Sequence, residues 1–189
     1  MDAFLLSFGV IFLAELGDKS QLMALAFAAR YPAVPVLIAI TLATALVHLG
    51  SVALGATVAL ALPTNLISIV AGVAFLVFAA WTLRGDRLDE SDDDRVRRAA
   101  GSVILTVGTA FLLAELGDKT MLATVTLATH EEPIGTWIGS TVGMVVADAI
   151  AIGVGKVLGT RLPERAVRVG AAVAFVVFGL ILIWQGLRG

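Results

Sequence analysis

Apolar residues run along this chain in six long stretches, which short polar breaks separate. The stretches cover residues 3–29, 34–62, 66–83, 102–129, 134–160 and 166–187. A helix of about 20 residues crosses the hydrocarbon layer of a bilayer, and each stretch is long enough to do so. Prolines mark several of the breaks, at Pro32, Pro63, Pro133 and Pro163, where they stop a helix from continuing. The pattern predicts an all-α integral membrane protein with six transmembrane helices.

Composition supports the same class. Hydrophobic residues make up 59% of the 189 positions and charged residues only 15%, and the mean hydropathy is +0.98. A soluble domain carries about 25% charged residues, so a soluble fold and a nucleic-acid-binding protein are excluded. The chain has no cysteine, which excludes disulfides and thiolate metal sites. Because the first stretch opens with Asp2 and contains Glu15, we expect a retained span and not a cleaved signal peptide.

The distribution of arginines predicts the orientation, because basic loops stay on the cytoplasmic side of a membrane. With both termini outside, the cytoplasmic side receives Arg30, Arg84, Arg87, Arg95, Arg97, Arg98, Arg161, Arg165 and Arg168, and the outer side only Arg188. The acidic run within residues 86–100 is interpreted as a solvated linker, since short loops of mixed charge usually are.

The chain contains an internal repeat. The hexamer Ala-Glu-Leu-Gly-Asp-Lys occurs at 14–19 and again at 114–119, an offset of 100 residues, and Leu62-Pro63 recurs as Leu162-Pro163 at the same offset. We therefore expect a first three-helix repeat at 1–85, a charged cytoplasmic linker at 86–100 and a second three-helix repeat at 101–189. Because each repeat has an odd number of spans, the second enters the membrane from the opposite side, which predicts two inverted-topology repeats.

Each hexamer brings two carboxylates to the middle of a predicted span. Glu15 and Asp18 are three residues apart, as are Glu115 and Asp118, and this spacing puts two side chains on one face of a helix. The glycine between them lowers helix propensity, and a break there would free carbonyl oxygens as further ligands. Further polar groups follow in the chain: the hydroxyls of Ser20 and Thr120, and the amide of Gln21, which Met121 replaces in the second copy.

An all-oxygen site of this kind suits Mn²⁺, Ca²⁺ or Mg²⁺. Lys19 and Lys119 directly follow the aspartates and are expected to balance part of the charge. Four acids and two lysines leave two negative charges, which protons or a divalent cation must neutralise at bilayer depth. Because a bound cation displaces protons from clustered carboxylates, the charge count favours exchange of a cation for protons over a purely structural network.

Other residues in the spans carry weaker signals. His48 and Asp148 occupy equivalent positions in the two repeats and are candidate accessory ligands or proton relays, although a lone histidine is more often hydrogen-bonded within helix packing. Gly135, Gly139 and Gly143 recur every four residues, which predicts close helix contact. Four aromatic residues are predicted to pack and not to gate a pathway: Phe75, Phe78, Phe175 and Phe178.

The two hexamers, each followed by a hydroxyl residue, resemble the twin Glu-x-Gly-Asp-Lys-Ser/Thr signature of a membrane family of Ca²⁺/Mn²⁺:H⁺ antiporters. Its eukaryotic members lie in Golgi-type membranes, and its bacterial members export manganese. The resemblance implies that Mn²⁺ or Ca²⁺ is transported, that H⁺ is the counter-ion and that no prosthetic group is needed. The short chain resembles the bacterial branch, which implies a bacterial plasma membrane and export from the cytoplasm. The ligands it implies are Glu15, Asp18, Glu115 and Asp118, with Ser20 and Thr120 as auxiliary ligands.

Three alternatives stay open on the sequence. The carboxylates could bind the amine of a small cationic metabolite, such as a basic amino acid, for export. An enzyme acting on lipid pyrophosphates has little support, because phosphate binding needs an arginine or serine cluster and only two lysines lie near midplane depth. The third alternative is a structural scaffold. The expected partners are the divalent cation and the lipid bilayer, and the oligomeric state is left open, a homodimer included.

Overall fold

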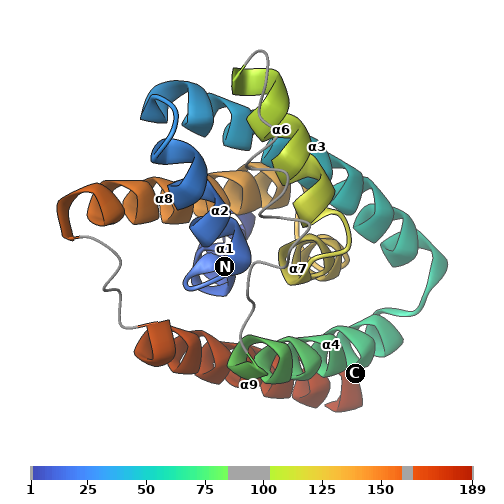
Figure 1. Cartoon of the computed structure of the whole chain (residues 1–189). Coiled ribbons are helices and arrows are strands. Elements are labelled where there is room, and N and C mark those ends of the chain that lie inside the picture. The colour runs from blue at the N-terminus through green and yellow to red at the C-terminus, as the bar shows by residue number, and fades with distance from the viewer. Residues whose placement is uncertain (1, 85–102, 159–163, 189) are drawn as a thin grey trace.

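The computed structural model describes residues 2–84, 103–158 and 164–188, and the regular secondary structure in these ranges is helical (Figure 1). The first half contains α1 (Ala3–Glu15), α2 (Lys19–Ala28), α3 (Ala33–Ala61) and α4 (Thr64–Arg84). The second half contains α6 (Val103–Glu115), α7 (Lys119–Ala128), α8 (Pro133–Leu158) and α9 (Glu164–Arg188). The all-α class is confirmed. The predicted linker at 86–100 and the Leu162-Pro163 pair lie outside the described residues.

The first and fourth predicted spans are each split into two helices. α1 ends at Glu15 and α2 begins at Lys19, and the same break separates α6 from α7. Within the breaks Gly17 and Gly117 have φ angles of 76° and 83°, in the left-handed region that glycine adopts without steric cost. The prediction that the glutamate and aspartate of a motif share one helical face is therefore wrong, because the helix ends between them and Asp18 is the N-cap residue of α2.

Glycines allow the helix backbones to touch. An added Cβ at Gly143 of α8 would lie 2.6 Å from the carbonyl oxygen of Phe8 in α1, and Gly139 lies against Phe4. Residue numbers rise together along both helices, so α1 and α8 are parallel. The predicted close packing of the glycine series is confirmed.

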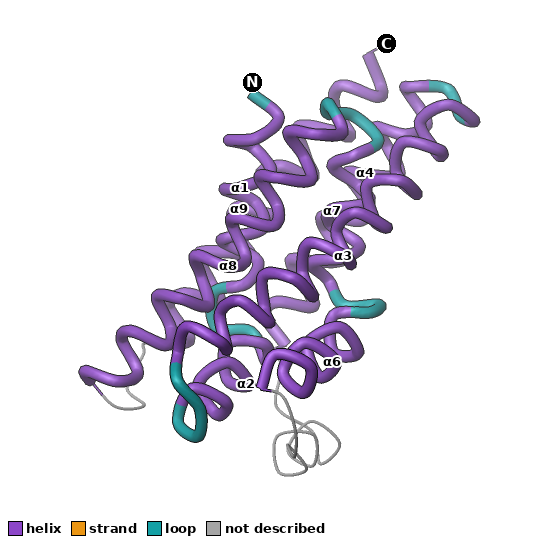
Figure 2. The backbone as a smooth tube through the Cα atoms, turned by 90° about the horizontal axis from the view of Figure 1, so that it is seen from above, coloured by secondary structure: helices purple, strands orange, loops and turns teal. Residues whose placement is uncertain are grey.

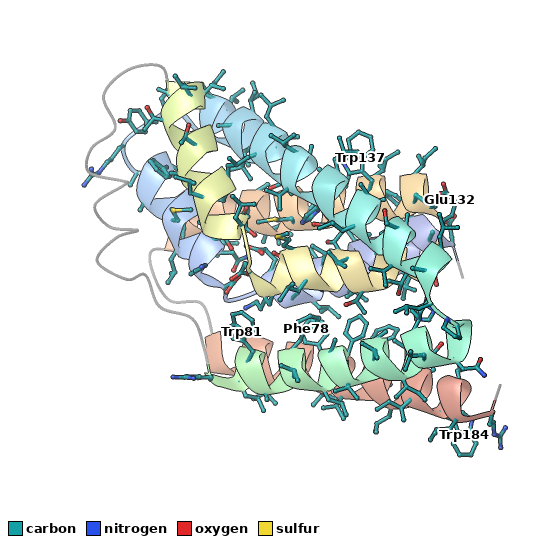
Figure 3. The ribbon with its side chains drawn as sticks, turned by 90° about the vertical axis from the view of Figure 1, so that its right-hand side faces the viewer. Phe78, Trp81, Glu132, Trp137 and Trp184 are labelled. Carbon is teal, nitrogen blue, oxygen red and sulfur yellow. The ribbon has the colours of Figure 1, made fainter. Side chains whose placement is uncertain are left out.

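The helices of the third and sixth predicted spans, α4 and α9, pair in the opposite sense. Gly72 of α4 lies against Gly179 of α9, and Asn65 near the start of α4 lies against Gly186 near the end of α9. α4 and α9 are therefore antiparallel. They lie side by side as a separate layer, while the other helices of the described ranges form a bundle (Figures 1 and 3).

Aromatic residues of this layer pack against one another, and Phe75, Phe78 and Phe175 share a hydrophobic cluster with residues of α1 and α7 in the bundle. The ring centroids of Phe75 and Phe175 are 5.9 Å apart, and Phe78 and Phe178 pack against the same pair. Phe78 points from α4 towards the bundle in Figure 3, while Trp184 points away. The predicted packing role of the four phenylalanines is confirmed.

The bundle exposes large apolar side chains and buries acidic ones beside its hydrophobic core. Leu60 is 91% exposed and Leu46 60%, whereas Glu15, Glu115 and Asp148 are 0% exposed. Soluble proteins show the reverse arrangement, and an apolar exterior is what a lipid environment requires. Within the described ranges α3 and Pro133–Val154 of α8 are long and apolar enough to cross a membrane, and further apolar helices are shorter.

Candidate cation site

The breaks of the two split helices meet in the interior of the bundle. Lys119 Nζ donates to Asp18 Oδ1 at 2.7 Å, and Lys19 Nζ lies 3.5 Å from Asp118 Oδ1. Each lysine thus forms an ion pair with the aspartate of the other motif. The two contacts are reciprocal, as they are when two equivalent surfaces meet across a two-fold axis.

The hydroxyl residues hold the glutamates. Ser20 Oγ donates to Glu15 Oε1 and lies 3.3 Å from Asp18 Oδ2, so it links the two carboxylates of its motif across the break. Thr120 Oγ1 donates to Glu115 Oε2 at 2.9 Å. The two hydroxyls that sequence analysis assigned to the motifs therefore contact the carboxylates, and each leaves one glutamate oxygen unengaged.

The break of the first motif is also braced against α8. Gln21 Oε1 accepts a hydrogen bond from Gly17 N at 2.8 Å, and its Nε2 donates to the carbonyl oxygen of Ala147 at 3.0 Å. In the second motif Met121 Sδ takes the place of that amide oxygen, 3.1 Å from Gly117 N. The sequence suggested Gln21 only as an accessory group of the site. The brace depends on the helix break and on α8, which the local pattern does not specify.

Several buried oxygens of the motifs have no hydrogen-bond partner among the described residues: Glu15 Oε2, Glu115 Oε1 and Asp118 Oδ2. Leaving a buried acceptor unsatisfied costs about 1–3 kcal/mol, so these atoms suit a ligand that brings positive charge. No three His, Cys, Asp or Glu side chains in the described part of the chain are placed to hold one metal ion. The four motif carboxylates therefore do not converge on one point in this structure, and the metal-ligand set stays a prediction.

His48 and Asp148 are both fully buried. Neither the two nitrogens of His48 nor the two oxygens of Asp148 have a hydrogen-bond partner in the described ranges. Ala147, the residue before Asp148, accepts the hydrogen bond from Gln21, so Asp148 lies on the turn of α8 that contacts α2 beside the break. Asp148 therefore lies next to the first motif.

Comparison with known proteins identifies the family. Residues 3–90 and 103–189 match the model of a family described as divalent cation/proton antiporter GDT1. The chain belongs to the GDT1 family. It is therefore a membrane transporter that exchanges divalent cations for protons and not an enzyme. The match falls in two parts, one in each half of the chain, which suggests a repeat. Because the family transports divalent cations, its substrate class favours a divalent cation over a small cationic metabolite.

Individual relatives cover nearly the whole chain. The chain is 34% identical over 183 residues to a Vibrio cholerae protein named "Putative manganese exporter", covering 95% of this chain and 90% of that protein. It is 29% identical to GDT1-like protein sll0615 of Synechocystis, covering 97% and 98% of the two chains. With protein PAM71 of Arabidopsis thaliana, a chloroplast protein, the identity is 31% over 94% of this chain and 55% of the relative. No solved structure matches the chain.

Proposed function

We propose that this GDT1-family antiporter exports Mn²⁺ from the cytoplasm of a bacterium in exchange for protons, by alternating access at the two motifs. The observation that carries the proposal is the reciprocal contact of two acidic helix breaks inside an otherwise apolar membrane protein. The name of the Vibrio cholerae relative supports manganese as the cation and export as the direction.

The proposed ligands are the four motif carboxylates with the two hydroxyls, from Glu15, Asp18, Ser20, Glu115, Asp118 and Thr120. Since the aspartates pair with lysines, the unengaged oxygens of Glu15 and Glu115 are the first to meet an entering cation. The ion then draws the remaining carboxylates towards it, which the discontinuous helices allow because their ends are held by side chains and not by a continuous backbone ladder. Ca²⁺ is retained as an alternative substrate, because the donors are all oxygen.

Proton coupling follows from the charge of the site. With two lysines paired to two aspartates, Glu15 and Glu115 carry the excess negative charge of the motifs. A charge left bare at bilayer depth is costly, so either protons or a divalent cation must accompany these groups as the protein changes state. Two protons neutralise this excess charge, and so does one Mn²⁺. Exchange of two protons for one Mn²⁺ therefore keeps the site near neutrality in every state.

The proposed topology is six crossings in two inverted repeats, with both termini outside the cytoplasm. Parallel packing of α1 with α8 and antiparallel packing of α4 with α9 are the directions that six alternating crossings require. The ends of the chain lie at the same end of the molecule in Figure 2, as an even number of crossings demands. The arginines of the loops favour the inner side for the loop after the first span.

Proteoliposomes test the proposed function. The purified protein is reconstituted with a pH-sensitive dye inside, and Mn²⁺ is added outside under an imposed pH gradient. Mn²⁺ entry should be accompanied by proton exit. Glu15→Gln or Glu115→Gln should reduce both fluxes at least about tenfold, because each removes a negative charge that the cation or a proton neutralises.

A matched control and two competitors complete the test. Gln185→Glu adds a carboxylate outside the motifs, in a pocket that Glu131 also lines, and should leave the coupled fluxes intact. Excess Ca²⁺ should compete with Mn²⁺ if both fit the site, whereas excess lysine or arginine should not. Mn²⁺ flux that moves no protons, or that survives in both glutamate variants, would show that the motifs are not the exchange site.

A further inference from the structure

Asp148 is the one acidic residue of α8 in the described part of the helix, and nothing in its surroundings explains its burial. Its side chain is 0% exposed, and neither oxygen has a hydrogen-bond partner among the described residues. Structural carboxylates in a protein interior are normally paired or hydrogen-bonded, since an unsatisfied one is costly. An unpartnered carboxylate at this depth is therefore a candidate ligand-binding group.

The placement of Asp148 points to the motifs. The preceding residue, Ala147, accepts the hydrogen bond from Gln21, which fixes this turn of α8 against the break between α1 and α2. Asp148 is the next residue of α8 and is fully buried, so it lies beside the break that Glu15 and Asp18 flank. The residue thus adds a carboxylate from a third helix next to the first motif.

The surroundings of the second motif do not repeat this arrangement. At the equivalent position α3 carries His48, and Met121 replaces the glutamine that reaches α8. Because equivalent positions of the two repeats hold a histidine in one case and an aspartate in the other, the packing of the helices does not require a carboxylate at position 148. A role in binding accounts for its presence better than a role in the fold.

This inference rests on the proposed function. We propose that Asp148 is a fifth carboxylate that contacts the transported divalent cation, and that this contact makes the cation bind more strongly to the first motif than to the second. The unengaged oxygens of Glu15 and Asp148 would face the ion together, with Ser20 holding Glu15 in place. Carboxylate pairs with additional neutral oxygens are the donor sets that Mn²⁺, Ca²⁺ and Mg²⁺ prefer.

Thermal unfolding of the purified full chain in detergent tests this inference, with Mn²⁺ alone as the probe and Ca²⁺ and Mg²⁺ as comparators. Asp148→Asn should unfold at the wild-type temperature without metal, lose most of the Mn²⁺-induced rise in Tm, and raise the KM for Mn²⁺ transport at least about tenfold. Thr141→Val is the matched control, since Thr141 lies two turns earlier on the same face of α8, is 9% exposed and also has no hydrogen-bond partner for its hydroxyl. It should keep the wild-type metal response.

The outcomes are distinct. An Asp148→Asn protein with wild-type KM and a wild-type Mn²⁺ response overturns the inference, while loss of that response in Glu15→Gln in the same experiment leaves the proposed function standing. A wild-type protein that shows no response to any of the three ions contradicts the proposed function itself. If Asp148→Asn does not fold, Asp148→Glu decides: an altered ratio of the Mn²⁺, Ca²⁺ and Mg²⁺ affinities supports contact with the ion, and an unchanged ratio overturns it.

Discussion

The two motif lysines are equivalent in sequence but not in environment. The side chain of Lys119 is 4% exposed and lies 2.7 Å from Asp18, whereas that of Lys19 is 24% exposed and lies 3.5 Å from Asp118. A buried ion pair that loses one partner leaves an uncompensated charge, which costs about 3–5 kcal/mol, and each lysine here pairs with a buried aspartate. The pair of Lys19 is longer and partly solvated, so less stability depends on that lysine. The two ion pairs of the site therefore differ in length and in exposure to water.

This difference predicts that substitutions of the two lysines destabilise the protein unequally. Lys119→Met should lower the free energy of unfolding by about 3 kcal/mol without metal. Lys19→Met should lower it by less, because Asp118 is also buried but lies farther from its lysine, which is partly solvated. Denaturant unfolding in detergent measures both. Adding Asp18→Asn to Lys119→Met should recover part of the loss, because the unpaired charge is removed. Equal losses for the two single lysine variants would contradict the asymmetry.

Sequence analysis singled out the residues that flank the two helix breaks but not how they pair. Glu15, Asp18, Ser20 and their counterparts stand out because charge and hydroxyls interrupt an apolar stretch. The partner of each lysine lies 99 or 101 residues away along the chain, and such pairing depends on how two helix breaks meet in space. Neighbouring residues in the sequence carry no signal for it.

Among the helices, contact between α1 and α8 depends on glycines that have no side chain to separate the backbones. Gly143→Ala would place a methyl group 2.6 Å from the Phe8 carbonyl oxygen, and backbone atoms on both sides leave little room to move. Overpacking of this kind costs about 1–3 kcal/mol.

The matched control lies on the same helix. Gly153 has no atom within 4 Å of an added Cβ, so Gly153→Ala should be neutral or slightly stabilising. We expect Gly143→Ala to lower the unfolding temperature in detergent and Gly153→Ala to keep or raise it. A stable Gly143→Ala protein would mean that α1 and α8 are not in backbone contact.

The helix boundaries illustrate what hydropathy can and cannot predict. The continuous helices α3 and α8 begin and end within a few residues of the predicted stretches, because proline and charge limit them. The breaks at Gly17 and Gly117 are invisible to hydropathy, since the apolar stretch continues on both sides. Their only sequence signal is a glycine between two carboxylates, which permitted a break without requiring one.

Across the whole molecule, the repeat was predictable from the identical hexamers, whereas the contacts between the halves were not. Phe75 packs on Phe175, and Thr44 Oγ1 lies 3.4 Å from Met144 Sδ, so residues related by the repeat meet their own counterparts. Contacts of this kind occur near a two-fold axis. They depend on long-range packing, which the sequence of either half does not encode alone.

Inverted topology makes a direct prediction for a chain without native cysteines. Tyr31→Cys and Glu131→Cys lie at equivalent positions of the two repeats and should react with a membrane-impermeant thiol reagent from opposite sides of the membrane. Position 31 should label only from the cytoplasmic side in inverted vesicles, and position 131 only from outside in intact cells. Labelling of both positions from one side would rule out the inverted arrangement.

The central claim is that both acidic helix breaks bind the cation that the antiporter moves. Anomalous X-ray scattering at the manganese edge, from crystals grown with Mn²⁺, tests it most directly. We predict a single peak between Glu15 and Glu115, within coordination distance of both carboxylates. A fully occupied Mn²⁺ peak elsewhere in the membrane region, with neither glutamate as a ligand, would contradict the account.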